Sequence, residues 1–278
     1  MKYFLMVLLC FMLSVCANAA KSEFFFVQIA DTQLGFTTQN KDLGPDIANF
    51  EKAVDNINRL KPAFVVISGD MTNAANDPAQ ISAFHSVVKK IRKGIGVFLV
   101  AGNHDMYTAT KEDIANYQKS YGKDYYSFNC RGSKFIVLDS LLLWHKTADP
   151  IARTAQRVWF EEQLNSAKNK RSHHIFVFTH HPWFLEKPDE ADAYWTVPLT
   201  YRNDYLSLME KYGVDFAVAG HYHREALGYA GKLTMTTTAP MAVPMGPEPV
   251  GFKVFKVYKD HVEFQYYGLA QIPEKIEL

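Results

Sequence analysis

The sequence predicts an α/β fold built as one domain. Short apolar runs rich in β-branched and aromatic residues alternate with segments whose apolar residues recur at helical spacing. The chain has 278 residues, of which 48% are hydrophobic, so it can bury one large core. We find no internal repeat, low-complexity tract or long linker that would divide it into two folding units.

The first half of the chain reads as strand, helix, strand, helix and strand. Pro45 suits a first helical turn, and Pro62 ends the helix that follows it. A second helix is predicted after Pro78, where apolar residues again recur at helical spacing. The three predicted strands are the apolar runs 24–30, 63–68 and 97–101.

More strands and helices are predicted in the second half. Thr110 and Asp113 resemble a capping box, which indicates a short helix. Apolar spacing predicts helices around residues 159–164 and 205–209, with strands at 125–129, 134–139, 175–179, 215–219, 232–238, 252–258 and 262–267. The aromatic, acidic stretch 183–198 and the stretch 240–249, which holds four of the twelve prolines, are predicted to be ordered loops. The aromatic residues of the first loop either line a cleft or pack in the core, and both alternatives stay open.

The charge balance excludes two classes of partner. Thirty Lys and Arg residues face 29 Asp and Glu residues, the net charge is +1, and no run of five like charges occurs. The composition therefore predicts neither nucleic acid nor an anionic membrane surface as a partner.

The first 19 residues are predicted to be a signal peptide. Lys2 precedes an apolar stretch that ends at Val15, and small residues follow up to Ala20. The stretch is shorter than the roughly 20 residues of a membrane-spanning helix, so no membrane span is predicted. We expect an exported protein, periplasmic or secreted, whose single domain covers residues 20–278. An alternative stays open in which the lipobox-like residues before Cys16 direct a lipid anchor onto that cysteine.

Five predicted strands end in a polar residue that can bind a metal ion. In open α/β sheets, ligands bind outside the carboxyl ends of the strands, so five such residues can converge on one crevice. Asp and Asn also close strands as turn formers, which explains one such ending but not five. The residues are Asp31, Asp70, Asn103, His180 and His221.

Two short motifs strengthen this prediction. Gly102 to Asp105 reads Gly-Asn-His-Asp, which average composition would produce in about one chain of this length in a thousand. Gly220 to His223 reads Gly-His-Tyr-His, and a histidine pair two residues apart in a strand-end loop can present both rings to one metal cluster.

Together these motifs resemble those of the calcineurin-like metallophosphoesterase superfamily, over nearly all of the chain that follows the signal peptide. Within it, the stretch Asp31 to Gly35, the pair His180 and Pro182, and the stretch Gly220 to Arg224 look closest to the animal calcineurin-like phosphoesterase domain-containing proteins. The resemblance implies a four-layer α/β/β/α sandwich with two mixed β-sheets and a pair of bound divalent metal ions.

The resemblance also implies the metal ligands, with Asp70 as the carboxylate that bridges both ions. Spacing alone leaves His181 as an alternative to His180, and the His-x-Pro order of the family favours His180. The remaining ligands would be Asp31, Gln33 and His223 at the first ion and Asn103, His180 and His221 at the second.

The implied chemistry is attack on phosphorus by a hydroxide that bridges the two metals. His104 would stabilise charge on the phosphoryl group and protonate the leaving oxygen, with Asp105 orienting its ring. Arg224, whose guanidinium suits phosphate oxygens or a surface salt bridge, and Asn73 are candidate substrate-binding residues. Asn73 stands where purple acid phosphatases carry a metal-binding tyrosine, so that subgroup is disfavoured.

Gln33 stands where most of the superfamily has a histidine. Its amide oxygen makes the first site rich in hard oxygen ligands, which favour manganese, with iron, zinc and cobalt as alternatives.

We therefore predict a binuclear metal-dependent phosphatase that hydrolyses phosphomonoesters, with a small-molecule phosphate ester or a phosphoprotein as substrate. The alternatives are a phosphodiesterase acting on cyclic nucleotides or glycerophosphodiesters, and a metal-binding surface protein without turnover. Specificity depends on loops whose conformation no motif determines, so the sequence does not identify the substrate.

Overall fold

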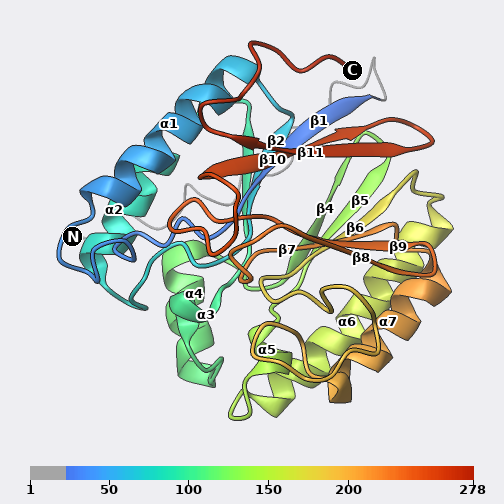
Figure 1. The fold of residues 1–278 in the computed structure, drawn as a ribbon. Coiled ribbons are helices and arrows are strands. Elements are labelled where there is room, and N and C mark those ends of the chain that lie inside the picture. The colour runs from blue at the N-terminus through green and yellow to red at the C-terminus, as the bar shows by residue number, and fades with distance from the viewer. Residues whose placement is uncertain (1–22) are drawn as a thin grey trace, which may run out of the picture.

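Two β-sheets pack face to face, and helices cover the outer side of each (Figure 1). The computed structural model describes residues 23–278. The predicted signal peptide and its alternative, lipidation of Cys16, therefore lie outside the described residues.

The first sheet has five strands in the order β11, β10, β1, β2, β3. The three strands from the first half of the chain pair in parallel, whereas β10 is antiparallel to both β1 and β11. Their bounds are β1 Phe24–Ile29, β2 Phe64–Ile67, β3 Gly96–Leu99, β10 Gly251–Val257 and β11 Val262–Gly268.

The second sheet has six strands in the order β4, β5, β6, β7, β9, β8. The four central strands pair in parallel, and both edge strands are antiparallel to their neighbours. Their bounds are β4 Tyr126–Cys130, β5 Ser133–Val137, β6 Ile175–Phe178, β7 Phe216–Ala219, β8 Ala226–Ala230 and β9 Leu233–Thr237.

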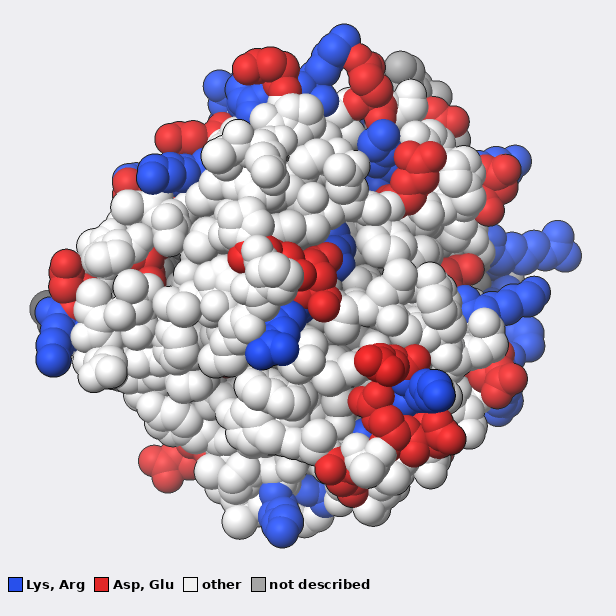
Figure 2. Space-filling view, in the orientation of Figure 1, with Lys and Arg blue, Asp and Glu red and all other residues white. Residues whose placement is uncertain are grey.

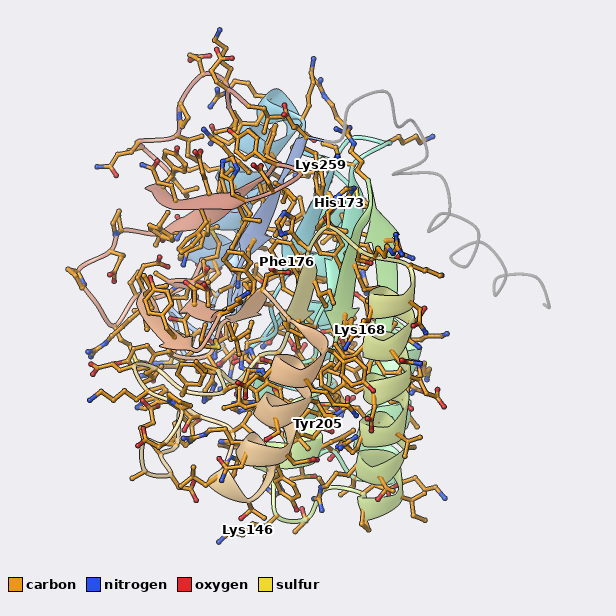
Figure 3. The ribbon with its side chains drawn as sticks, turned by 90° about the vertical axis from the view of Figure 1, so that its right-hand side faces the viewer. Lys146, Lys168, His173, Phe176, Tyr205 and Lys259 are labelled. Carbon is orange, nitrogen blue, oxygen red and sulfur yellow. The ribbon has the colours of Figure 1, made fainter. Side chains whose placement is uncertain are left out.

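Four long helices form the outer layers. Figure 1 shows α1 (Gly44–Leu60) and α2 (Pro78–Val88) beside the first sheet. Figure 3 shows α6 (Pro150–Asn169) and α7 (Leu199–Tyr212) side by side on the second, where Tyr205 of α7 stacks on Phe160 of α6 with ring centroids 5.4 Å apart. The predicted four-layer sandwich of two mixed sheets is thus confirmed.

Three hydrophobic cores separate the four layers. Along β1, Phe24 and Phe26 face the second sheet, whereas Phe25, Val27 and Ile29 face α1 and α2. This follows from the two-residue period of a strand, which sends successive side chains to opposite faces. The outer core of the second sheet joins its strands to α6 and α7 in the same way.

The core between the sheets is largely phenylalanine. Phe26 stacks on Phe255 with ring centroids 4.7 Å apart and meets Phe176 edge to face at 5.5 Å. Phe176 lies on β6 of the opposite sheet (Figure 3), so these rings join the two sheets directly. Burying one such ring contributes about 1.5–3 kcal/mol.

The local predictions agree closely with these elements. Proline stands in the first turn of α1 and of α2. Thr110 and Asp113 exchange the two hydrogen bonds of a capping box, each 3.3 Å long, at the start of α4 (Lys111–Tyr121). Two four-residue helices were not predicted, α3 (Asn103–Met106) and α5 (Leu141–Trp144), because one turn carries no periodic pattern.

Both predicted loops lack helices, and apart from one isolated bridge between Ala30 and Pro240 they lack strand pairing. No helix among residues 23–278 has the length and apolar character needed to cross a bilayer.

Candidate metal centre

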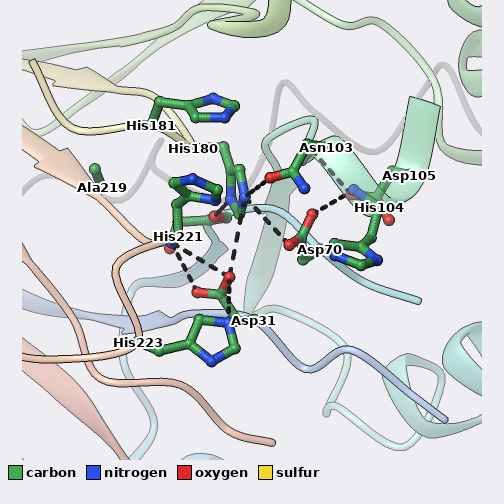
Figure 4. A network of polar contacts seen from close by, with 12 residues as sticks. Asp31, Asp70, Asn103, His104, Asp105, His180, His181, Ala219, His221 and His223 are labelled. Atoms are coloured by element: carbon green, nitrogen blue, oxygen red, sulfur yellow. Dashed lines mark hydrogen bonds and ion pairs between the residues drawn. The ribbon is translucent and has the colours of Figure 1, made fainter. Parts of the chain in front are cut away.

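The five predicted strand ends meet at one edge of the sandwich (Figure 4). Asp31, Asp70 and Asn103 follow the adjacent strands β1, β2 and β3 of the first sheet. His180 and His221 follow the adjacent strands β6 and β7 of the second. The centre therefore lies between the sheets, with ligands from both.

His180 stands at the middle of the cluster and is fully buried. Its Nε2 atom lies 3.0 Å from Asn103 Oδ1, 3.3 Å from Asp70 Oδ2 and 4.0 Å from Asp31 Oδ1. Among the described residues, Asp70, His180 and His221 also offer ligand atoms that all lie within 4.8 Å of one another.

Asp31 links this group to the last motif of the chain. The backbone N–H of His221 donates to both carboxylate oxygens of Asp31, at 3.2 and 3.1 Å. The Nε2 atom of His223 lies 3.5 Å from Asp31 Oδ1. Six of the seven predicted ligands are thereby joined by direct contacts.

Gln33 supplies a test of whether a metal suits this site. Its backbone N–H donates to the carbonyl of Asp70 at 2.7 Å, which ties the two ligand loops together. Its side-chain Oε1 is buried and has no hydrogen-bond partner within the described chain. An acceptor without a donor is costly inside a protein, and a cation would satisfy it.

The tautomers of two histidines also indicate that a metal ion suits this site. The Nδ1 atoms of His180 and His223 each lie 2.9 Å from a backbone carbonyl, of Ser68 and Val243 respectively. A carbonyl only accepts, so in a neutral ring Nδ1 carries the proton and the Nε2 lone pair faces carboxylate oxygens. The lone pairs of Nε2 and of the carboxylate oxygens repel each other unless a proton or a metal ion lies between them.

Without metal, the electrostatics around His180 favour a proton in that position. Burial lowers the pKa of His180, but the charge and hydrogen bond of Asp70, with Asp31, raise it to about 9. Burial raises the pKa of Asp70, but His180 and then His104 hold it well below its usual value. The donor set of carboxylate, amide and imidazole thus suits divalent cations, which would replace that proton.

The ligand loops are held in strained backbone conformations. Five of the seven ligands have φ between 37° and 63°, a left-handed region that non-glycine residues seldom adopt. Such conformations cost on the order of 1–3 kcal/mol each and persist where the surroundings enforce them, often at functional sites. The five are Asp31, Gln33, Asp70, His221 and His223.

Close packing explains two of the glycines that precede ligands. A Cβ atom at Gly102 would stand 2.2 Å from Asp70 Oδ1, and one at Gly69 would stand 2.3 Å from His180 Nδ1. No larger residue leaves room for these ligands.

His104 lies beside Asp70, the predicted bridging carboxylate. Its backbone N–H donates to Asp70 Oδ1 at 2.8 Å, and its Nδ1 lies 2.8 Å from the carbonyl of Asn73. Because Nδ1 is held by that acceptor, Nε2 is the nitrogen available to a substrate.

The expectation that Asp105 orients this ring needs correction. Asp105 Oδ1 accepts the N–H groups of Met71 and Thr72 at 2.9 and 3.3 Å, and Oδ2 accepts that of Gly102 at 2.9 Å. Asp105 therefore braces the Asp70 loop against the Asn103 loop, and the Asn73 carbonyl holds the ring. Burial, followed by the charge of Asp70, raises the pKa of Asp105 well above its usual value.

The two candidate substrate-binding residues lie at the edge of the centre. The side-chain amide of Asn73 donates to Asn40 Oδ1 at 2.8 Å, so the loop already uses it. Arg224 is exposed, and its guanidinium lies over the ring of Tyr222, 5.7 Å from the centroid.

Between the two neighbouring histidines, the geometry selects His180. The ring of His181 turns away, with Nδ1 2.9 Å from Ser140 Oγ and its face stacked on Trp144 at 4.5 Å. It packs against the ring of His221, 4.2 Å away, and so supports a ligand from behind.

The aromatic stretch 183–198 both packs in the core and lies beside the metal centre. Trp183 and Phe184 are fully buried in the outer core of the second sheet. Tyr194 and Trp195 instead lie beside the metal centre, with ring centroids 5.1 and 5.6 Å from that of His221.

Gln28 is a residue that the sequence reasoning missed. It is fully buried on β1, and its amide nitrogen donates to Ser68 Oγ and to the carbonyl of Ala219, both at 2.9 Å. Thr238 donates to its Oε1 at 2.6 Å. Gln28 thus ties together the strands that carry Asp31, Asp70 and His221, and a glutamine inside the apolar run 24–30 was the signal for it.

Comparison with known proteins supports this geometry. The family model of calcineurin-like phosphoesterases matches residues 26–225. The chain is 33% identical to serine/threonine-protein phosphatase CPPED1 of Mus musculus, over 91% of this chain and 86% of that protein, and 33% identical to that of Homo sapiens, over 92% and 87%. The crystal structure of a dimetal phosphatase from Danio rerio shares the fold with a TM-score of 0.71 at 16% identity, over 88% of this chain and 96% of that one.

Proposed function

The chain belongs to the calcineurin-like phosphoesterase family, and from this premise we propose that it hydrolyses phosphomonoesters with two bound divalent metal ions. Membership makes it a metal-dependent phosphoesterase. The observation that carries the proposal is the cluster around His180, in which two carboxylates, an amide and an imidazole converge with His104 beside them. The phosphatase names of the relatives support a monoester as substrate.

The seven predicted ligands would divide between two ions, with Asp70 available to both. When bound, the ions would supply Lewis acidity and a water of lowered pKa. The residues that would hold them are Asp31, Gln33, Asp70 and His223 for one ion, and Asp70, Asn103, His180 and His221 for the other.

The residues of the chain itself perform the remaining tasks. His104 presents Nε2 to the substrate while its Nδ1 proton is held by the Asn73 carbonyl, so in its imidazolium form it can give the second proton, on Nε2, to the leaving oxygen. Asp105 keeps the Asp70 and Asn103 loops in register, and Gln28 does the same for the strands beneath them.

Steady-state kinetics with 4-nitrophenyl phosphate and bis(4-nitrophenyl) phosphate test the proposal. The monoester should be the better substrate, and His104→Ala should lower kcat/KM by about 10²–10⁴-fold while metal content stays unchanged. Asp70→Ala should lose both metal and activity, and the exposed His261→Ala is the matched control. A strong preference for the diester would establish a phosphodiesterase instead, and no turnover with any divalent metal would leave a metal-binding protein.

We propose manganese for the oxygen-rich first site. Metal-free protein should regain the highest activity with Mn²⁺, and Gln33→His should shift the preference toward Zn²⁺. An unchanged order of metals in this variant would contradict the role of Gln33.

We also propose that the protein is exported and cleaved near Ala19 or Ala20, on the strength of the sequence pattern alone. Mass spectrometry of the mature N-terminus tests this directly. A diacylglycerol adduct that is lost in Cys16→Ala would establish the lipid-anchored alternative.

A further inference from the structure

Four aromatic side chains from three separate segments gather beside His221, a predicted metal ligand. Trp144 ends α5, Tyr194 and Trp195 lie in the loop before α7, and Tyr222 stands inside the last metal-binding motif. We call these four residues the aromatic rim. Three of their ring centroids lie 5.1 to 6.0 Å from that of His221.

Tyr194 and Trp195 meet the other members of the rim only edge to face. Tyr194 meets Trp144 at an interplanar angle of 80° and Trp195 at 84°, and Trp195 meets Tyr222 at 75°. Edge-to-face contacts do not cover the face of both rings. Trp144 is stacked on His181 and Arg224 lies over Tyr222, whereas Tyr194 and Trp195 make no parallel stacking contact with any described residue and meet His221 only at a tilt. Their rings are therefore the ones on which a planar ligand can stack.

Core packing does not account for these two residues. Trp183 and Phe184 in the same loop show 0% exposure, whereas Tyr194 is 55% exposed and Trp195 is half-buried. These two side chains therefore lack the stabilisation that burial gives Trp183 and Phe184. Exposed aromatic rings beside a candidate metal centre are typical of a binding surface.

Hydrogen bonds to its backbone nevertheless hold the loop that carries the two rings in place. Trp144 Nε1 donates to the carbonyl of Tyr194 at 2.8 Å. From below, the buried guanidinium of Arg202 donates to the carbonyls of Val197 and Glu190 at 2.9 and 2.6 Å. A ring surface fixed in advance binds a planar partner with little loss of conformational entropy.

The charge distribution favours an uncharged ring as the partner. Asp and Glu side chains gather beside α5 (Figure 2), and the loop of Tyr194 and Trp195 carries Glu186, Asp189, Glu190 and Asp192 against a single Lys, so an anionic ring would be repelled there. A phosphate held at the metals would supply the charge, and the rim would contact the rest of the substrate.

We propose that the substrates are phosphomonoesters whose leaving group carries a planar aromatic ring, which packs on Tyr194 and Trp195. The inference rests on the proposed phosphomonoesterase activity and names its substrate class. A nucleoside and an aryl group share this chemistry, and the experiment separates them.

Adenosine 5′-monophosphate and ribose 5-phosphate make a matched pair, because the same primary alcohol leaves from both and only the base differs. Wild type should show a kcat/KM at least 5-fold higher for the nucleotide, the factor that about 1 kcal/mol of base stacking represents. The double variant Tyr194→Ala/Trp195→Ala should lose that advantage while ribose 5-phosphate changes less than about 2-fold. Trp195→Phe should retain most of it.

Tyr229→Ala is the control, because Tyr229 is 59% exposed on β8 and outside the rim. It should leave both values unchanged. Metal content and the circular dichroism spectrum should match wild type in every variant. A peptide phosphorylated on tyrosine, assayed beside the nucleotide, assigns the ring source to whichever substrate loses more in the double variant.

Two results together would overturn the inference and leave the phosphomonoesterase proposal intact. In wild type, kcat/KM would be equal for adenosine 5′-monophosphate and ribose 5-phosphate, and in the double variant kcat/KM for the phosphotyrosine peptide would not fall. An equal fall for ribose 5-phosphate and both ring-bearing substrates would also overturn it, because the rim would then support only the metal centre. Failure to hydrolyse any monoester, 4-nitrophenyl phosphate included, would overturn the proposed function as well.

Discussion

Replacing Gly102 by alanine should displace Asp70, the predicted bridging carboxylate, although no predicted ligand is itself replaced. The new Cβ would stand 2.1 Å from the backbone nitrogen of Asp70 and 2.2 Å from its Oδ1, whereas ordinary contacts begin at 3.4 Å. The two groups must therefore separate by about 1.2 Å. The backbone of Gly102 has φ −111°, which alanine adopts freely. Any effect of the substitution therefore comes from the contact of the new Cβ with Asp70 and not from backbone strain.

A displacement near 1 Å at a reacting centre costs about 10²-fold in rate. We expect kcat/KM for 4-nitrophenyl phosphate to fall by about that factor, and overpacking to lower the free energy of unfolding by about 1–3 kcal/mol. Steady-state kinetics at saturating Mn²⁺, metal content by mass spectrometry and urea unfolding in EDTA measure the three effects.

Gly44→Ala is the matched control. A Cβ there meets only the carboxylate of the exposed Asp42, at 3.2 Å, and that side chain can move. Gly102→Ala protein with metal content and kcat/KM within 2-fold of this control would refute the reasoning, because the centre would then tolerate a shift that its packing forbids.

Three further outcomes are expected. Gln28→Leu should lower the free energy of unfolding in urea by about 1–3 kcal/mol for each buried polar group it leaves unpaired, and an unchanged value would contradict the role of Gln28 as a tie between strands. Glu225→Gln should cost about 3–5 kcal/mol in the same assay, because Lys253 Nζ is buried 2.8 Å from Glu225 Oε2; a loss below about 1 kcal/mol would show that Thr236 and the Thr237 carbonyl suffice. Mn²⁺ at about 100 times its Kd should stabilise the protein by about 2.7 kcal/mol and raise Tm by about 5–10 °C over an EDTA sample, and a shift that survives in Asp70→Ala would place the metal elsewhere.

Most of the secondary structure could be predicted because its signals are local. The alternation of Phe24 to Ile29 between two faces, proline in the first turns of α1 and α2, and the capping box at Thr110 each depend on neighbours a few residues apart. The one-turn helices α3 and α5 were missed for the same reason, since four residues are too few to show a period.

The residues of the candidate metal centre could be predicted from their types at or just after strand ends, but two assignments beside them depended on packing. Asp105 follows His104 directly in sequence, yet its carboxylate binds the backbone of the Asp70 loop. His181 follows His180, and only its stacking on Trp144 separates a supporting ring from a ligand.

The sequence by itself determined the order of the longer helices and most strands, the residue types of the candidate metal centre and the resemblance to a phosphoesterase family. Only the tertiary structure decided how Asp31 meets His221 from 190 positions away, which aromatic residues reach the metal centre, and that Gln28 ties the strands below it. The physical reason is that local patterns reflect the preferences of neighbouring residues. Contacts across the two sheets depend on how their faces pack, which no single stretch of chain encodes.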